Sequence, residues 1–215
     1  MTELKELLRN SRERFENAAI ERVDAELLLA HVLGVERMQL HAQSFHLSLE
    51  QQELFEELIN LRISGIPVQY LIGEAPFRYL TFSVGSGVLI PRPETELLVD
   101  AAMVEIERLK SSFNATSAPV SVVDLGAGSG AISISIAHEA RQRSLPVHVV
   151  AVEKSDQALE WLKKNIARHE VDVRVIHNDV REALMDVKCD IVACDIFLQP
   201  FQRLIRFLNC NDMDR

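Results

Sequence analysis

The chain of 215 residues has few cysteines, no long apolar run and no excess of basic residues. Its three cysteines, Cys189, Cys194 and Cys210, are too few and too clustered for a disulfide framework, which favours a reducing compartment. No stretch reaches the roughly 18 uncharged apolar residues that a membrane span needs. The opening residues include acidic side chains and lack the apolar segment of a secretory signal. We therefore expect a cytoplasmic protein that does not contact a membrane.

Acidic residues outnumber basic ones by 32 to 23, and the formal net charge is −9. A surface that binds nucleic acid by neutralising phosphates needs the opposite balance, so no direct nucleic-acid partner is expected. Hydrophobic residues make up 47 % of the chain, which is enough for a core and too much for a disordered protein. Cys189 and Cys194 have no histidine at ligand spacing, so no metal site is expected either.

Residues 1–65 have the periodicity of helices, and we interpret them as a small helical domain. Asp24 is predicted to cap a helix that ends at Gly34. Ser48 and Gln51 have the spacing of a capping box at the start of a further helix. The apolar positions expected to share one face of that helix are Leu54, Leu58 and Leu61.

The helical period is lost between residues 66 and 93. Glycines and prolines interrupt short apolar runs there, which is typical of a β-hairpin or an irregular β-linker. A new helix is predicted from Glu94 to about Lys110, with acidic side chains near its positive N-terminal end.

From residue 120 onward, apolar runs of strand length alternate with helical patterns. Strands are predicted at 120–123, 147–152, 173–176 and 190–194, with helices around 131–137 and at 156–169. Strand and helix alternating at this spacing predict right-handed crossovers and a parallel sheet, hence an α/β domain.

A glycine-rich turn follows the first of these strands and precedes a helix. It consists of Gly126, Ala127, Gly128, Ser129 and Gly130. Glycines at such a place let the backbone turn sharply and let a ligand lie against bare peptide. The same residues also satisfy the dinucleotide fingerprint, so the pattern is compatible with a nicotinamide dinucleotide, with S-adenosylmethionine or with a purely structural turn.

Acidic residues follow the second and third strands at the same edge of the expected sheet. A carboxylate at Glu153 can accept hydrogen bonds from both hydroxyls of a ribose, which narrows the ligand to a nucleoside without separating the two cofactors. Asp179 and Val180 come next along this edge and are placed to flank an adenine ring. An aspartate in a loop after a strand is also a common turn residue.

Three segments carry a specific resemblance: Gln69-Tyr70-Leu71-Ile72-Gly73, the stretch from Phe77 to Phe82, and Val88-Leu89-Ile90-Pro91-Arg92-Pro93-Glu94-Thr95-Glu96. They strongly resemble the HemK/PrmC family of protein-(glutamine-N5) methyltransferases, which modify peptide chain release factors. The likeness implies a helical substrate-recognition domain at 1–65, a β-hairpin linker at 66–93 and a Rossmann-like methyltransferase domain at 94–195.

The resemblance also implies S-adenosylmethionine as the cofactor. The glycine turn, residues 126–130, would lie under its methionine and ribose portions, and Glu153 would hold the ribose hydroxyls. Asp179 and Val180 would lie beside the adenine. The position of Val180 is often aromatic in relatives, so weaker stacking on the adenine is expected here.

The reaction that the resemblance implies is methyl transfer to the side-chain amide nitrogen of a glutamine, with Phe77, Arg92 and Glu94 on the substrate side. That nitrogen is a poor nucleophile because its lone pair is delocalised. Relatives orient it with an Asn-Pro-Pro-Tyr motif directly after the fourth strand. Here Asp195 stands at the asparagine position and residues 196–198 lack the rest. The alternative is therefore a catalytically inactive, truncated module that binds the cofactor or a partner.

Residues 196–215 do not resemble the family. We expect this divergent tail to be out-of-frame or alternatively spliced sequence, with a functional but divergent ending as the alternative. The later strands of the family's sheet are not found, so an incomplete sheet with exposed apolar surface is expected. An NAD-dependent oxidoreductase stays open as a third possibility, on the glycine pattern alone.

Overall fold

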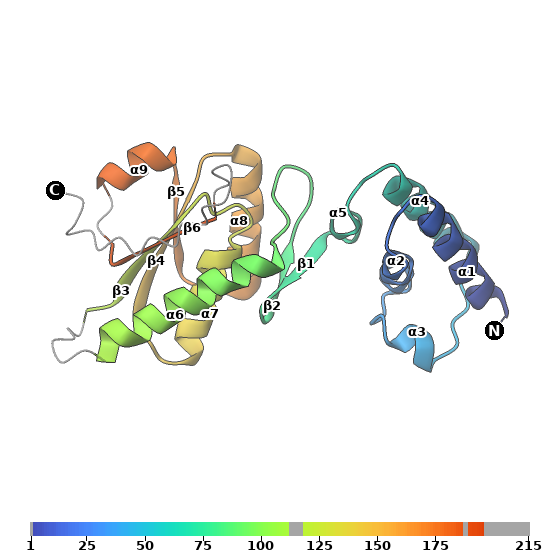
Figure 1. Ribbon diagram of the computed structural model, residues 1–215, viewed down its shortest axis with the longest axis horizontal. Coiled ribbons are helices and arrows are strands. Elements are labelled where there is room, and N and C mark those ends of the chain that lie inside the picture. Colours follow the sequence, from blue (N-terminus) through green and yellow to red (C-terminus); the bar gives the residue numbers. More distant parts are fainter. Residues whose placement is uncertain (1, 112–117, 187–188, 196–215) are drawn as a thin grey trace. The chain divides into compact units, whose positions relative to one another are not determined.

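The computed structural model describes residues 2–111, 118–186 and 189–195 (Figure 1). The chain divides into two compact units, Met1–Gly73 and Glu74–Arg215, which we call the helical unit and the sheet unit. The predicted divergent tail at 196–215 lies outside the described residues. Within the described ranges, no helix is both long and apolar enough to cross a membrane.

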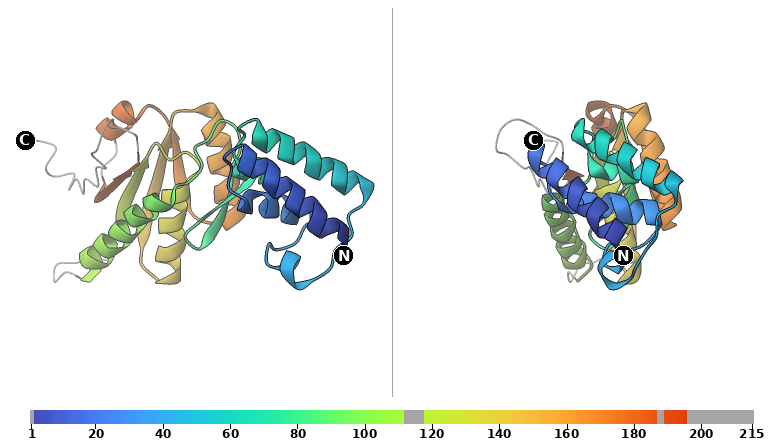
Figure 2. Two further views of the ribbon diagram at one scale, coloured as in Figure 1. Left: turned by 45° about the vertical axis from the view of Figure 1, so that its right-hand side comes forward. Right: turned by 90° about the vertical axis from the view of Figure 1, so that its right-hand side faces the viewer.

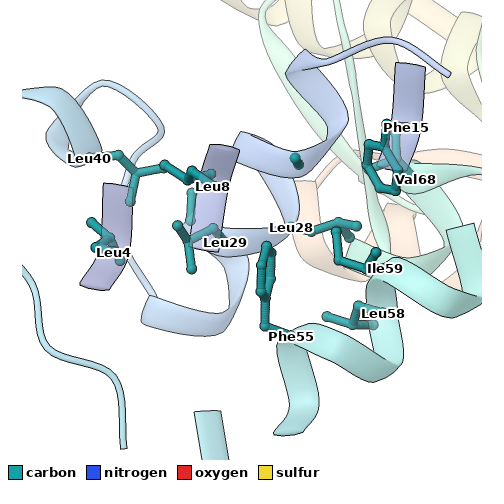
Figure 3. Close-up of a cluster of buried hydrophobic side chains, with 12 residues drawn as sticks. Leu4, Leu8, Phe15, Leu28, Leu29, Leu40, Phe55, Leu58, Ile59 and Val68 are labelled. Atoms are coloured by element: carbon teal, nitrogen blue, oxygen red, sulfur yellow. The ribbon is translucent and has the colours of Figure 1, made fainter. Parts of the chain in front are cut away.

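The helical unit is built around an apolar core. Its helices are α1 Thr2–Asn17, α2 Val23–Leu33, α3 Gln39–Ala42, α4 Leu49–Ile63 and α5 Val68–Ile72. Two buried rings and a set of aliphatic side chains fill the space between them (Figure 3): Leu4, Leu8, Phe15, Leu28, Leu29, Leu40, Phe55, Leu58, Ile59 and Val68. Helices α1 and α4 lie side by side (Figure 2), where Arg14 pairs with Glu56 at 2.6 Å.

Local sequence signals predicted where these helices end better than they predicted the hydrogen-bond partners of individual side chains. The capping box of Ser48 and Gln51 at α4 is confirmed, and Gly34 ends α2 with a φ of +65°. The cap predicted at Asp24 is wrong, because α2 begins one residue earlier. Asp24 is buried in the first turn, where its carboxylate accepts a hydrogen bond from Arg62 Nε of α4 at 2.8 Å.

The apolar face predicted for α4 is partly wrong. Leu58 is buried as expected, but Leu54 is 44 % exposed and Leu61 is half-buried. The core face consists of Phe55, Leu58 and Ile59, at spacings of three and four residues, and α4 presents it to α2. More than one set of apolar residues in this helix has the spacing of a single face. The set that packs against α2 is the one that contains Phe55.

The sheet unit opens with a hairpin of β1 Glu74–Phe77 and β2 Leu80–Ser83, paired antiparallel. Phe77 pairs with Leu80, so the turn consists of Arg78 and Tyr79. The helix predicted from Glu94 is α6 Glu96–Ser111, preceded by the 3-10 turn η1 Pro93–Thr95. The short helix α5, just before the hairpin, was not predicted.

A parallel sheet follows, as the sequence predicts. Its strands are β3 Val120–Leu125, β4 Val147–Glu153, β5 Val173–His177 and β6 Ile191–Cys194, and their order is β5-β4-β3-β6. The helices between them are α7 Ala131–Gln142, α8 Asp156–His169 and α9 Val180–Asp186. Ala183 of α9 packs with the valines of β3, β4 and β6 on one face of the sheet. Since all four strands run in one direction, their carboxyl ends meet at one edge.

Candidate functional site

The glycine turn lies at that edge, between β3 and α7. Gly126, Gly128 and Gly130 all have a positive φ, of +70°, +57° and +83°. A Cβ at Gly130 would come within 2.6 Å of Leu162 Cδ1, so any other residue would combine a strained backbone with a shift of Leu162 on α8. At Gly128 the nearest non-adjacent atom to such a Cβ is Val88 Cγ2, at 3.9 Å. Gly130 is buried, whereas Gly126 is exposed and Gly128 is half-buried, so the turn packs tightly at its end and presents bare peptide at its beginning.

Glu153, the last residue of β4, holds the glycine turn in place. One carboxylate oxygen, Oε1, accepts hydrogen bonds from the backbone N–H groups of Lys154 and Ser155, each at 2.8 Å. The other, Oε2, accepts from the N–H of Gly128 at 2.8 Å. A carboxylate offers about four lone-pair positions, so these three bonds leave Oε2 with capacity for one more donor.

Asp124 is a site residue that the sequence reasoning missed. It precedes the glycine turn by two residues, and it is 1 % exposed. Its Oδ2 accepts a hydrogen bond from the Ser133 N–H at 3.0 Å, while Oδ1 makes none within the described residues. Burial raises the pKa of Asp124 to about 6, and the negative charges of Glu153 and Asp195 act in the same direction. Its position directly ahead of a glycine-rich turn was the available signal.

Asp195 follows β6 and is half-buried. Its Oδ2 accepts a hydrogen bond from the Thr95 hydroxyl at 2.5 Å. Thr95 lies near the end of the proline-rich segment, by which we mean residues 88–96, so this contact joins that segment to the end of β6. Val88, at the start of the same segment, is buried beside Gly128. The proline-rich segment therefore lies next to both the glycine turn and the end of β6, which are motifs that the sequence analysis identified separately.

Asp179 lies in the loop after β5, next to the turn that follows β4. It pairs with Lys154 Nζ at 2.9 Å and with Arg181 Nε at 3.2 Å. These hydrogen bonds, Arg181 first, hold the pKa of Asp179 well below its usual range. Val180 begins α9 and is half-buried against the sheet. Both residues are therefore at the predicted edge of the sheet.

The three residues predicted on the substrate side differ in exposure. Arg92 and Glu94 are exposed on the proline-rich segment. Phe77 is only 1 % exposed and packs edge-on against Phe82, with 6.0 Å between the ring centroids. In this structure Phe77 therefore supports the hairpin from inside. Within the part of the chain that the structure describes, no three His, Cys, Asp or Glu side chains gather as a metal site.

Two family models match the chain. The PrmC N-terminal domain matches residues 6–73, and the methyltransferase small domain matches residues 102–200. The first of these covers the helical unit, and the second covers the parallel sheet and the glycine turn.

Curated relatives agree with both models. The release factor glutamine methyltransferase of Chlorobaculum tepidum is 41 % identical over 155 residues, which cover 72 % of this chain and 50 % of the relative. That of Xylella fastidiosa strain 9a5c is 38 % identical over 175 residues, 80 % of this chain and 59 % of the relative. The chain spans about half the length of the curated relatives it matches.

Among solved structures, the 16S rRNA N2 G1207 methyltransferase of T. thermophilus, in complex with AdoMet and guanosine, aligns with a TM-score of 0.44. The identity is 25 %, and the alignment covers 60 % of this chain and 33 % of that one.

Proposed function

Because this chain belongs to the HemK/PrmC family of release factor glutamine methyltransferases, we propose that it binds S-adenosylmethionine. We propose further that it transfers the methyl group to the side-chain amide nitrogen of a glutamine in a peptide chain release factor. The observation that carries this proposal is the group of carboxylates around the glycine turn: Asp124, Glu153 and Asp195. The compartment proposed is the cytoplasm, with no direct contact to nucleic acid or membrane.

The residues of this edge fit a cationic nucleoside. Asp124 keeps a buried oxygen without a hydrogen bond in the described residues, and Glu153 Oε2 keeps one acceptor position. Three neighbouring carboxylates create a negative potential, which attracts the sulfonium and ammonium groups of S-adenosylmethionine. The pyrophosphate of a nicotinamide dinucleotide would be repelled by the same charges. The negative charge at this edge therefore favours S-adenosylmethionine over the nicotinamide dinucleotide, the two cofactors with which the glycine pattern is compatible.

Each residue at the edge has a proposed task. Glu153 accepts a hydrogen bond from one ribose hydroxyl at its remaining lone pair, and a second hydroxyl would replace the N–H of Gly128. Asp179 and Val180 flank the adenine. Residues 126–130, with the small side chains of Ala127 and Ser129, lie under the methionine and ribose portions. When bound, the cofactor supplies an electrophilic methyl group on a sulfonium.

The substrate side consists of the proline-rich segment and the end of β6. A carboxylate accepts several hydrogen bonds, so Asp195 can hold the Thr95 hydroxyl and also accept from an amide N–H of the glutamine. Such a bond orients the amide and draws electron density onto its nitrogen. Formation of the N–CH3 bond would break the S–CH3 bond of the sulfonium and leave S-adenosylhomocysteine as the product, and Asp195 would accept the amide proton that is lost. Arg92 and Glu94 are exposed where they can contact the release factor.

A second candidate is a module that binds the cofactor and transfers nothing. The observation in its favour is the residue at the asparagine position, because Asp195 is charged and already accepts from Thr95. The two candidates share the cofactor site and differ at residues 195–198, of which the structure describes Asp195.

The test measures binding and transfer separately. Calorimetry with S-adenosylmethionine should show binding by the full chain and a loss of about tenfold or more with Glu153→Gln, because a charged acceptor of the ribose is removed. Incubation with labelled cofactor and a release factor should label the factor, and Asp195→Asn, which restores the residue of the relatives, should label it faster. Cofactor binding without label in either protein favours the second candidate. If the full chain binds nicotinamide dinucleotide and not S-adenosylmethionine, both candidates are wrong.

A further inference from the structure

Helix α8 contacts two segments that are far apart in the sequence (Figure 1). Leu162 packs against Gly130 of the glycine turn. Next to Leu162, Trp161 Nε1 donates to the Ser86 carbonyl at 3.1 Å, and about two helical turns further on His169 Nε2 donates to the Thr81 carbonyl at 3.1 Å. The helix is therefore placed between the proposed cofactor turn and the hairpin that leads into the proline-rich segment.

Asn165 is the residue of α8 that joins both segments through one side chain. It is fully buried, with 0 % exposure. Its Oδ1 accepts from the Ser83 N–H at 2.7 Å, and its Nδ2 donates to the Ser83 carbonyl at 3.0 Å. The same Nδ2 donates to the carbonyl of Ser129, in the glycine turn, at 2.9 Å.

The chemistry of the carboxamide fits this position and no charged or purely accepting group does. Two carbonyls need donors and one N–H needs an acceptor, which is what an amide offers. Turning the amide over would place its NH2 against the Ser83 N–H and its oxygen against two carbonyls, so the contacts fix one orientation. Buried hydrogen bonds that are all satisfied make a rigid connection, since breaking one leaves a polar group unpaired.

We propose that Asn165 is a positioning residue that couples the glycine turn to the hairpin, so that ordering of the turn by the cofactor also orders the hairpin on the substrate side. The coupling to a cofactor rests on the proposed function. The mechanical connection itself does not, because it is made of contacts within the chain. Asn165 touches neither reactant and acts through the backbones of Ser83 and Ser129.

A neighbouring contact supplies the matched control. His169 also holds the hairpin, through the Thr81 carbonyl and through its ring, which lies 5.2 Å from the Phe82 ring. Neither of these two contacts involves the glycine turn. His169→Phe keeps a ring in place and removes the donor, so it loosens the hairpin and leaves the turn as it is.

The experiment follows hydrogen exchange by segment in the full chain, first without ligand. Asn165→Leu keeps most of the volume and removes all three hydrogen bonds, and we expect amide exchange to rise roughly tenfold both at 80–84 and at 126–131. His169→Phe should raise exchange at 80–84 only. Strand β5, residues 173–177, reports global loosening and should change in neither variant. Should Asn165→Leu not fold, Asn165→Asp keeps the size and the acceptor for the Ser83 N–H, and it is expected to raise exchange in the same two segments.

The second arm adds S-adenosylhomocysteine, the product form of the cofactor. In the wild type and in His169→Phe the nucleoside should slow exchange at 126–131 and also at 80–84. In the Asn165 variants it should slow exchange at 126–131 alone. Equal protection of the hairpin in an Asn165 variant, or exchange that rises at 80–84 without a rise at 126–131 in the first arm, overturns the coupling. A wild type that does not bind the nucleoside contradicts the proposed function, and the first arm still decides the connection.

Discussion

The helical unit and the sheet unit bury different kinds of side chain. In the described residues, the helical unit has an apolar core and buries only two polar residues, Ser11 and Asp24. The sheet unit buries many more: Ser83, Thr95, Asp124, Ser129, Ser133, Ser135, Glu139, Glu153 and Asn165.

The buried polar side chains of the sheet unit need hydrogen-bond partners at fixed places, because a buried polar group costs free energy unless it is hydrogen-bonded. In the sheet unit, most of these partners are backbone groups of the glycine turn, the hairpin and the strand ends. The helical unit is held by the packing of hydrocarbon, and the sheet unit by packing together with specific polar contacts. The candidate chemistry lies in the second.

Removal of a core ring should give the largest loss of stability. Phe55→Ala in α4 is expected to cost the helical unit about 3–5 kcal/mol, because the cavity adds to the lost transfer free energy. Leu54→Ala on the same helix should cost about 0.5 kcal/mol or less, since its side chain is 44 % exposed. Segment-resolved hydrogen exchange measures both. Equal losses for the two would mean that the core face of α4 is assigned wrongly.

In the sheet unit, the second-largest loss of stability is expected from breaking a buried ion pair. Arg78, at the hairpin turn, donates to both oxygens of Glu139 on α7 and pairs with Asp100 at 2.8 Å, and its side chain is 7 % exposed. Arg78→Leu should cost about 3 kcal/mol, because Glu139 is left buried beside the more distant Arg143 alone.

The double variant Arg78→Leu with Glu139→Leu sharpens this prediction. It removes the unpaired charge together with its partner, so it should be more stable than Arg78→Leu by about 1–2 kcal/mol in urea denaturation. A double variant less stable than the single one would show that Glu139 still stabilises the fold through its remaining ion pair with Arg143, and would contradict this prediction.

Asp124 should make the sheet unit sensitive to pH. Its folded pKa is raised to about 6 from a reference value of 3.8, mainly by burial. Between these values the folded protein holds a proton that the unfolded chain has released, so the free energy of unfolding falls as the pH rises from about 4 to about 6. The loss at pH 7 is about 2–3 kcal/mol. Asp124→Asn should flatten this slope and be more stable than wild type at pH 7, as urea midpoints across pH 4–7 would show. A slope unchanged by the substitution contradicts the assignment.

Helix caps should give small and equal effects in the two units. Ser48 caps α4 by accepting from the Gln51 N–H at 3.2 Å, and Ser155 caps α8 by accepting from the Ala158 N–H at 3.3 Å. Substitution of either serine by alanine should cost about 1 kcal/mol. Thermal unfolding and segment-resolved exchange provide the measurement. A much larger loss at Ser155 would mean that the cap also supports the adjacent turn around Glu153.

Elements of the sheet unit were predictable because their signals are local. The strand at β4 and the helix at α8 were predicted to within one residue, and β3, β5 and β6 to within two. The capping box at Ser48 was also readable from spacing alone. Each of these depends on neighbours within one or two turns of the chain.

Partners across the fold were not predictable in this way. The local sequence predicts Asp24 as a helix cap. Its carboxylate instead accepts a hydrogen bond from Arg62, which lies on another helix. The burial of Asp124 and the three hydrogen bonds of Asn165 have no counterpart in local spacing. In the sequence, Asn165 and His169 are polar residues of a helix with no sign that they contact the hairpin. Their partners, Ser83 and Thr81, become apparent only in the fold.

Local patterns in the sequence were enough to predict most of the strands, several of the helices, the glycine turn and the family, because backbone conformation and apolar period depend on residues close along the chain. Which polar groups share a buried environment could be seen only in the folded chain. Ser83 and Asn165 are 82 residues apart, and Gly128 and Glu153 are 25 apart, yet each pair is joined by a hydrogen bond. Desolvation and hydrogen bonding act between groups that are close in space, so pKa values and couplings follow from the folded chain.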